Sequence, residues 1–277
     1  MATTKNAASP KKSKGFTGIK SAIWVMLICL ILGYSFWYFV LGNPDNFAGG
    51  DVENGRPLNL MGTVYHGGYV VGLIFTLLVT VVALSIERYF GLKTAFGKGS
   101  LKKFVVEIKA AIKANDFAKA RAICDKQQGS VANVVLASVN TYQQMEETPG
   151  IKKAQKVAKI QQAHEEATQL EMPTLQMNLP IIATIVTLGT LTALFGTVLG
   201  MIGSFQALAA GGGGDSMALS MGISEALVNT AAGIATSWVA VVAYNTYTNK
   251  IDKLTYALDE VGYTIAQTYD ANHADEA

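Results

Sequence analysis

Uncharged apolar residues fall into four long blocks along the chain, and charged residues occupy the stretches between them. A helix needs about 20 mostly apolar residues to cross the hydrocarbon core of a bilayer. Each block reaches that length, so the pattern predicts four transmembrane helices. The predicted spans are residues 19–42, 67–87, 179–210 and 218–248.

The segments that flank and connect these spans are more polar and predict the domain organisation. We expect a basic tail over 1–18, a loop rich in Gly, Asn and Asp over 43–66, and a Gly-rich turn over 211–217. Apolar positions at helical spacing predict a helical domain over 88–178 and a further helix with a tail over 249–277. The expected fold class is all-α: a polytopic helical membrane protein whose long helices extend into a cytoplasmic helical domain.

Basic residues are distributed so unevenly that they predict the topology. Of the 22 lysines and arginines, all but Arg56 lie in residues 1–20, 88–178 or 249–277. Lysine and arginine accumulate on the cytoplasmic side of membrane proteins. We therefore expect both termini and the helical domain in the cytoplasm, with the two shorter connections outside. The net charge of +2 gives no reason to expect a nucleic-acid partner, so the surface lysines are expected to form either an ordinary solvated face or a contact with lipid headgroups.

The first predicted span is expected to remain as an anchor. A secretory signal peptide has a shorter apolar run, followed by a cleavage site of small residues. Here the run is long and ends in the bulky series Phe36-Trp37-Tyr38-Phe39. Aromatic residues at the end of a span also suit the membrane interface.

Residues suited to metal, redox or nucleophilic chemistry are few and scattered. Cys29 lies in a predicted span and Cys124 in the helical domain, so we expect no disulfide. The histidines, His66, His164 and His273, fall in different segments with no metal-ligand spacing. Phosphate-loop and nucleophile motifs are absent from the sequence. We therefore expect no metal, no cofactor and no enzymatic activity.

A single carboxylate lies inside a predicted span, in the stretch from Met172 to Asn249 that holds no basic residue. Asp215 falls in the Gly-rich turn, whereas Glu225 falls within the fourth span. A charged side chain at the centre of the hydrocarbon costs about 3 kcal/mol by insertion scales, unless it has a partner or a water path. Glu225 therefore either serves ion or proton movement or is a structural carboxyl, kept protonated or bonded to a neighbouring hydroxyl. The pattern leaves both alternatives open.

Small residues of two kinds line the third predicted span. Hydroxyl residues recur every seven positions and share one face, at Thr190, Thr197 and Ser204. Gly196 and Gly200 form a close-packing motif. Packing is a sufficient role for the glycines. The hydroxyls either bond the preceding turn of their own helix or line a polar pathway.

The fourth predicted span has two polar faces. A helix of this kind is poorly suited to contact lipid on both faces. Glu225, Asn229 and Thr236 lie within about 40° of one another at 100° per residue. Thr230 lies on another face, with the small residue Gly233 beside it. At least one of these faces must meet protein or water.

Two segments of these last spans resemble the ExbB/TolQ/MotA proton-channel superfamily. They are residues 195–202, with the sequence FGTVLGMI, and residues 222–233, with the sequence GISEALVNTAAG. Their order, their spacing and the hairpin between them also agree. The resemblance covers about residues 67–265 and is closest to the ExbB and TolQ branch.

The resemblance implies a ring of subunits, usually a pentamer, around the helix of an ExbD/TolR-type partner that has a single span and a membrane Asp. Proton flow would drive motion that is passed to a TonB- or TolA-like protein, in the inner membrane of a Gram-negative bacterium. It assigns Thr197 and Thr230 to the pore-lining hydroxyls and Glu225 to the intramembrane Glu of the family. The expected pore-adjacent polar residues are Thr190, Ser204, Asn229 and Thr236, and the expected packing glycines are Gly196, Gly200 and Gly233.

The expected function is thus an ExbB-like motor subunit that converts proton-motive force into mechanical work for TonB-dependent outer-membrane transport. A TolQ-like subunit for envelope maintenance is the nearest alternative. A flagellar-type stator fits less well, because the extra helices of that branch are not recognisable here. An alternative of another class is a non-conducting membrane scaffold whose hairpin only oligomerises.

Overall fold

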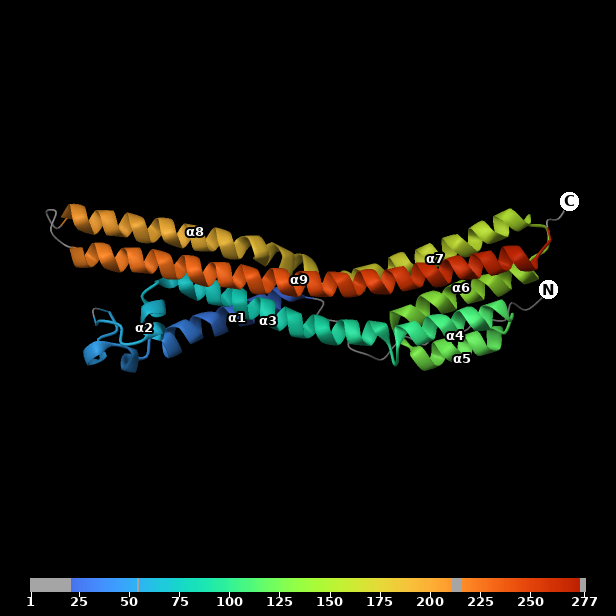
Figure 1. Ribbon diagram of the computed structural model, residues 1–277, viewed down its shortest axis with the longest axis horizontal. Helices are drawn as coiled ribbons and strands as arrows, with labels where there is room; N and C mark the ends of the chain where they lie inside the picture. Colours follow the sequence, from blue (N-terminus) through green and yellow to red (C-terminus); the bar gives the residue numbers. More distant parts are fainter. Residues whose placement is uncertain (1–20, 54, 211–215, 275–277) are drawn as a thin grey trace. The chain divides into compact units, whose positions relative to one another are not determined.

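The structure is a computed structural model that describes residues 21–53, 55–210 and 216–274 (Figure 1). The described residues form two compact units. The membrane unit comprises residues 21–87 and 178–246, and the polar unit comprises residues 88–177 and 247–274. The expected basic tail and most of the expected Gly-rich turn lie outside the described residues.

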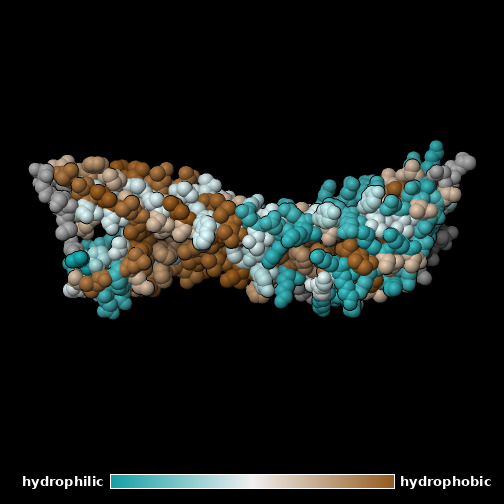
Figure 2. Space-filling model, viewed as in Figure 1, coloured by the Kyte–Doolittle hydropathy of each residue, from teal (hydrophilic) through white to brown (hydrophobic). Residues whose placement is uncertain are grey.

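Four helices in the described part of the chain are long and apolar enough to cross a membrane. They are α1 (Ala22–Ser35) with the π-helical turn η1 (Phe36–Leu41), α3 (Tyr69–Phe96), α8 (Leu179–Ala210) and α9 (Ser216–Asn272). No strand occurs within the described ranges. The predicted all-α fold of a four-span membrane protein is therefore confirmed. Figure 2 shows a mostly hydrophobic surface over the membrane unit and a mostly hydrophilic surface over the polar unit.

Helix α1 packs along α3 because glycines remove side chains from the contact between the two helices. A Cβ atom on Gly33 would lie 2.5 Å from Oγ1 of Thr76, and one on Gly72 would lie 2.8 Å from the ring of Tyr34. The Tyr34 hydroxyl also donates to the carbonyl of Tyr69, at 3.2 Å. Such close approach favours helix association in lipid, where apolar burial alone gives little driving force.

The first loop, residues 43–68, is built on an aromatic cluster. It contains two short 3-10 turns, η2 (Pro44–Asn46) and η3 (Ala48–Gly50), and the helix α2 (Leu60–Tyr65). Phe47 is 2% exposed, and its ring stacks on the imidazole of His66 with the centroids 5.1 Å apart. Trp37 from η1 stacks on Tyr65, at 4.8 Å. The aromatic contacts therefore fix the end of the loop next to the start of α3.

Helix α3 begins two residues later than the sequence pattern predicts for the second span. Gly67 and Gly68 belong to a turn before the helix, and Gly68 has a φ of +74°. That backbone conformation is outside the right-handed helical region and is the one that glycine adopts without cost. The apolar pattern could not exclude these residues, because glycine is neutral to hydrophobic periodicity.

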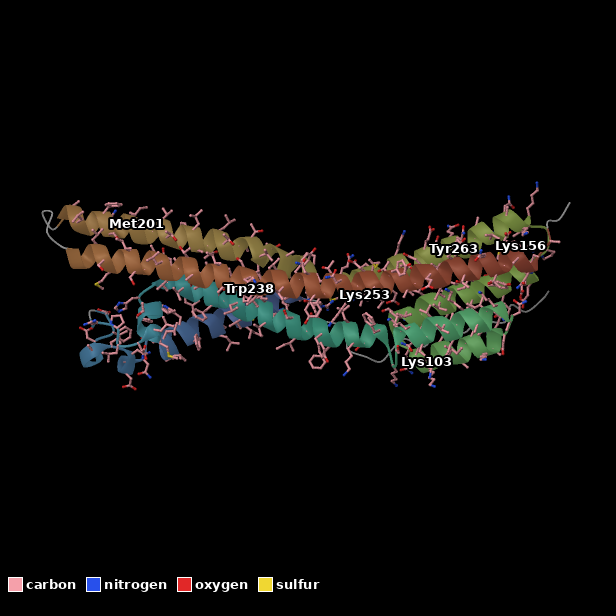
Figure 3. The ribbon with its side chains drawn as sticks, viewed as in Figure 1. Lys103, Lys156, Met201, Trp238, Lys253 and Tyr263 are labelled. Carbon is pink, nitrogen blue, oxygen red and sulfur yellow. The ribbon has the colours of Figure 1, made fainter. Side chains whose placement is uncertain are left out.

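The polar unit packs four helices against the last part of α9. They are α4 (Leu101–Lys113), α5 (Phe117–Gln127), α6 (Gly129–Glu147) and α7 (Lys153–Gln176). Apolar side chains at helical spacing form the core, among them Ile108, Ile112, Val135, Ile160 and Leu258. Lysines such as Lys103, Lys156 and Lys253 extend from its surface (Figure 3).

Polar side chains also lie in this core, among them His164 and Arg88. His164 is 7% exposed, and its Nδ1 atom lies 2.9 Å from the hydroxyl of Ser138. Burial lowers the pKa of His164, and this effect outweighs the opposing influence of Asp259 and Glu165. Arg88, which is completely buried, donates to the carbonyl of Thr174, at 3.2 Å. A cation suits the carbonyl groups at the C-terminal end of a helix, so Arg88 stabilises the end of α7.

Candidate functional site

Helices α8 and α9 lie in close contact along the membrane unit because small residues meet between them (Figure 1). A Cβ atom on Gly233 would lie 2.3 Å from the Cβ atom of Ala193. One on Gly196 would lie 2.8 Å from Cγ of Asn229, and one on Gly200 would lie 3.0 Å from a carbonyl oxygen of α9. Gly196, Gly200 and Gly233 thus lie at the contact between the two helices of one hairpin in one chain.

A pair of hydroxyls joins the two helices. Thr197 on α8 and Thr230 on α9 are hydrogen-bonded to each other. Oγ1 of Thr197 also lies 2.9 Å from the carbonyl oxygen of Ala193, and Oγ1 of Thr230 lies 3.0 Å from that of Ala226. Each hydroxyl has one proton, so one threonine donates to its partner while the other donates to its own helix. The direction of the bond can reverse without movement of a heavy atom, which is what a proton-conducting polar chain requires.

The other expected hydroxyls have different surroundings. Thr190 on α8 shares a hydrogen bond with Ser237 on α9, at 3.0 Å. Ser204 donates to the carbonyl of Gly200, at 2.8 Å, and Thr236 bonds its own helix in the same way, at 3.0 Å. Ser204 and Thr236 are buried, so the local helix satisfies them. The Thr190–Ser237 pair thus adds a second hydroxyl contact between α8 and α9.

Glu225 faces the turn before α3. A Cβ atom on Gly68 would lie only 2.8 Å from Oε1 of Glu225, so the backbone of that turn covers the carboxyl group. Glu225 itself is half-buried. A carboxyl group in this position is enclosed by peptide backbone on one side and open on another.

Asn229 lies one helical turn beyond Glu225 and ties the same loop to α9. Its Nδ2 atom donates to the carbonyl of Gly67, at 3.0 Å, and the residue is completely buried. Its Oδ1 atom has no hydrogen-bond partner among the described residues. A buried acceptor that lacks a donor costs about 1–3 kcal/mol, so this oxygen is suited to bind a water molecule.

Comparison with known proteins places this hairpin in a family. Residues 128–260 match the MotA/TolQ/ExbB proton channel family. The matching segment is just under half of the chain, and it is similar to that family. The chain is similar to the Tol-Pal system protein TolQ of Pseudomonas aeruginosa, with 29% identity over 124 residues, which cover 45% of this chain and 54% of that protein.

Two further relatives agree with this assignment to the MotA/TolQ/ExbB family. An ExbB-like biopolymer transport protein of Synechocystis sp. is 34% identical over 87 residues, covering 31% of this chain and 41% of that protein. TolQ of Haemophilus influenzae is 32% identical over 88 residues, covering 32% and 39%. The chain thus spans about half the length of these curated relatives, or less. With its four apolar helices, it is a multi-pass membrane protein, and its residues 128–260 match a proton-channel family.

The polar residues of the family domain form two groups on different sides of α9. The sequence pattern predicted two faces, one with Glu225 and Asn229 and one with Thr230. In the structure the Thr230 face meets α8, whereas the Glu225 face meets the first loop. Within the described ranges, the residues that could hold a metal ion form no cluster of three or more.

Sequence reasoning missed the residues that cover Glu225. The turn His66-Gly67-Gly68 lies before the matched segment, which begins at residue 128. Two adjacent glycines directly before an apolar run are the signal that could have indicated a close backbone contact.

Proposed function

We propose that this protein is an ExbB-like subunit of an oligomeric proton channel in the inner membrane of a Gram-negative bacterium. It conducts protons together with an ExbD/TolR-type partner that has one span and a membrane Asp. Proton-motive force then becomes mechanical work, which a TonB-like protein passes on for outer-membrane transport. The observation that carries the proposal is the hydrogen-bonded pair Thr197–Thr230, with Glu225 nearby in sequence, inside the hairpin that matches the proton-channel family.

The surfaces of the hairpin support assembly with other helices. Large apolar side chains are exposed on α8 and α9 of the single chain, including Leu191, Phe195, Val198, Leu227, Ile234 and Trp238. Trp238, for example, is 69% exposed (Figure 3). In a bilayer such faces contact lipid, further copies of the chain or the helix of the partner. These faces are the surfaces by which the proposed homopentamer would assemble around the partner helix.

A TolQ-like role in envelope maintenance is the second candidate, with a TolA-like protein as the mechanical partner. Two of the relatives reported above are TolQ proteins, and the P. aeruginosa protein matches over the longest segment of the three. Complementation separates the two roles. Restored TonB-dependent growth of a strain lacking its own ExbB supports the first, and restored detergent resistance of a strain lacking TolQ supports the second.

Proton flux into vesicles tests the channel itself. The protein is reconstituted with its single-span partner, and Thr197→Val, Thr230→Val and Glu225→Gln are compared with the wild type. Valine keeps the volume of threonine but removes the hydroxyl, and glutamine keeps the shape of glutamate but removes titration. We expect each variant to reduce flux at least about tenfold, which corresponds to about 1.4 kcal/mol in the barrier.

Thr184→Val is the matched control, because Thr184 is an exposed residue of α8 whose hydroxyl bonds only its own helix, at 2.8 Å from the Pro180 carbonyl. It should conduct like the wild type. Native mass measurement confirms that each variant complex is intact. Full flux in all three site variants would contradict the channel and favour a non-conducting scaffold.

A further inference from the structure

The segment before the family domain reaches the site through one short turn. The turn His66-Gly67-Gly68 joins α2 to α3, and both glycines lie where a side chain has no room. A Cβ atom on Gly68 would lie 2.8 Å from Oε1 of Glu225 and 3.7 Å from its Cδ atom. One on Gly67 would lie 2.4 Å from a methyl carbon of Val71 and 3.1 Å from one of Val228. The backbone of the turn therefore rests directly on α9.

Contacts on two sides hold this turn in place. On the side of α9, the buried amide of Asn229 donates to the Gly67 carbonyl, at 3.0 Å. On the side of the first loop, His66 stacks on the buried ring of Phe47, and its Nε2 atom lies 3.2 Å from the carbonyl oxygen of Val52. A carbonyl oxygen only accepts, so Nε2 carries the proton of this hydrogen bond.

The contacts continue from the turn back to the first span. Tyr65, the residue before His66, stacks on Trp37 with ring centroids 4.8 Å apart and lies 5.7 Å from Phe47. The indole of Trp37 also donates to the Tyr65 carbonyl, at 3.4 Å. Helix α1 is itself fixed to α3 at Gly33 and Gly72. A continuous series of packed groups thus links α1 to the carboxyl group of Glu225.

We propose that the N-terminal extension, comprising α1 with η1 and the first loop, positions Glu225 in the channel through the turn His66–Gly68. This inference rests on the proposed function, because it gives the extension a role in the same proton pathway. Gly68 covers the carboxyl group from the loop side, and Asn229 and His66 keep Gly68 there. The carboxyl group is thereby held toward α3, on the side of α9 away from the face that carries Thr230. The turn is a positioning element and does not itself exchange protons.

A hydrophobic carbodiimide tests the position of the carboxyl group independently of flux. Dicyclohexylcarbodiimide modifies protonated carboxyl groups in apolar surroundings, and mass spectrometry of full-length protein in native membranes gives the rate at Glu225. In Gly68→Ala the new methyl group displaces the carboxyl group. Small misplacements of a reacting group change rates strongly, so we expect the labelling rate to change about tenfold, with a parallel loss of flux.

Gly49→Ala is the matched control. Gly49 lies in the same loop with a φ of +73°, close to that of Gly68, but a Cβ atom there would meet nothing within 4 Å. The control therefore carries the same backbone strain without contact to Glu225 and should label like the wild type. Glu225→Gln gives the background of the assay.

A rescue distinguishes displacement of the carboxyl group from general damage. Aspartate is one methylene shorter than glutamate, so Glu225→Asp leaves room for the methyl group of alanine. In the Glu225→Asp background, Gly68→Ala should change the labelling rate of Asp by less than about twofold, since removal of the clash removes the coupling. If Gly68→Ala does not reach the membrane, Asn229→Ala is used in its place. It removes the hydrogen bond to the Gly67 carbonyl without adding bulk, and it should also change the labelling rate of Glu225.

Equal labelling in Gly68→Ala and Gly49→Ala would overturn the positioning role, whatever the flux. Equal effects of Gly68→Ala in the Glu and Asp backgrounds would overturn it as well. Failure of the proposed channel has a different signature, namely full flux in Thr197→Val, Thr230→Val and Glu225→Gln, while labelling of Glu225 in the otherwise unchanged protein still depends on Gly68.

Discussion

At the scale of single residues, the hydroxyl pair and the acid of the membrane unit differ in how completely the chain satisfies their hydrogen bonds. Thr197 and Thr230 satisfy each other across α8 and α9 and need no external partner. Glu225 is covered by the backbone of Gly68, and Asn229 next to it keeps one oxygen without a donor among the described residues. The hydroxyl pair is therefore complete in one chain, whereas the acid side of α9 leaves room for water or for a partner.

His164 in the polar unit gives a prediction for stability against pH. Its pKa is lowered in the folded protein by burial, so the unfolded chain binds the proton more readily. Stability is then fully present above the unfolded pKa of about 6.5 and falls below it, by at most about 1.4 kcal/mol for each pH unit. The protection of α7 amides against hydrogen exchange, taken relative to their intrinsic exchange rate at each pH, should therefore fall between pH 7 and pH 5.

The replacement His164→Asn should remove this extra pH dependence, because asparagine does not titrate. His273→Gln is the control, since His273 is half-exposed just after the end of α9, and its Nδ1 atom donates to the Tyr269 carbonyl instead of filling the core. An unchanged pH dependence in His164→Asn would assign the effect to another group.

At the scale of elements, the contact between α8 and α9 makes a prediction about glycine. The replacement Gly233→Ala puts a methyl group 2.3 Å from the Ala193 side chain and 2.6 Å from the Gly189 carbonyl oxygen. Overpacking of this kind costs about 1–3 kcal/mol, so we expect a lower midpoint of thermal unfolding in detergent. Gly203→Ala is the control on α8, where a Cβ atom would meet nothing within 4 Å.

The elements also show what the sequence could predict and what it could not. The bounds predicted for the third span coincide with those of α8, because an uncharged run with a polar break on each side marks a span well. The fourth span was predicted to end at residue 248, with a separate helix after it. In the structure α9 continues as one helix to Asn272, since no proline interrupts its backbone hydrogen bonds. A change from apolar to charged residues alters the surroundings of a helix and does not end it.

The candidate site was predictable only in part for a similar reason. A lone acid in an apolar run is visible in the sequence, and so is the hydroxyl face of each helix. The contact between Gly68 and Glu225 joins residues far apart in the chain. Glycine has no side chain, so no pattern of side chains in the sequence indicates this contact. Only the folded backbone shows that this turn covers the acid.

At the scale of the whole molecule, topology is the feature to test. Asp45 in the first loop and Lys113 at the end of α4 are both exposed. With the expected orientation, a membrane-impermeant maleimide should label Asp45→Cys in intact cells but Lys113→Cys only after permeabilisation. Labelling of Lys113→Cys in intact cells would contradict the expected topology.

The native cysteines do not obscure this measurement. Cys29 and Cys124 are each 2% exposed. Burial also raises the pKa of the Cys124 thiol to about 12, so almost no thiolate is present at neutral pH. The wild type should therefore show little labelling on either side, and both substitutions can be made in the natural background.

The close contact of α1 with α3 also has a consequence for biosynthesis. Its contacts join residues near one another in the chain, such as Gly33 with Thr76, so they are complete before the ribosome has made α8 or α9. Ribosome-bound chains that end near α4 should already protect this helical pair from protease. The turn His66-Gly67-Gly68, which covers Glu225 in the finished structure, would then be folded before α9 is made.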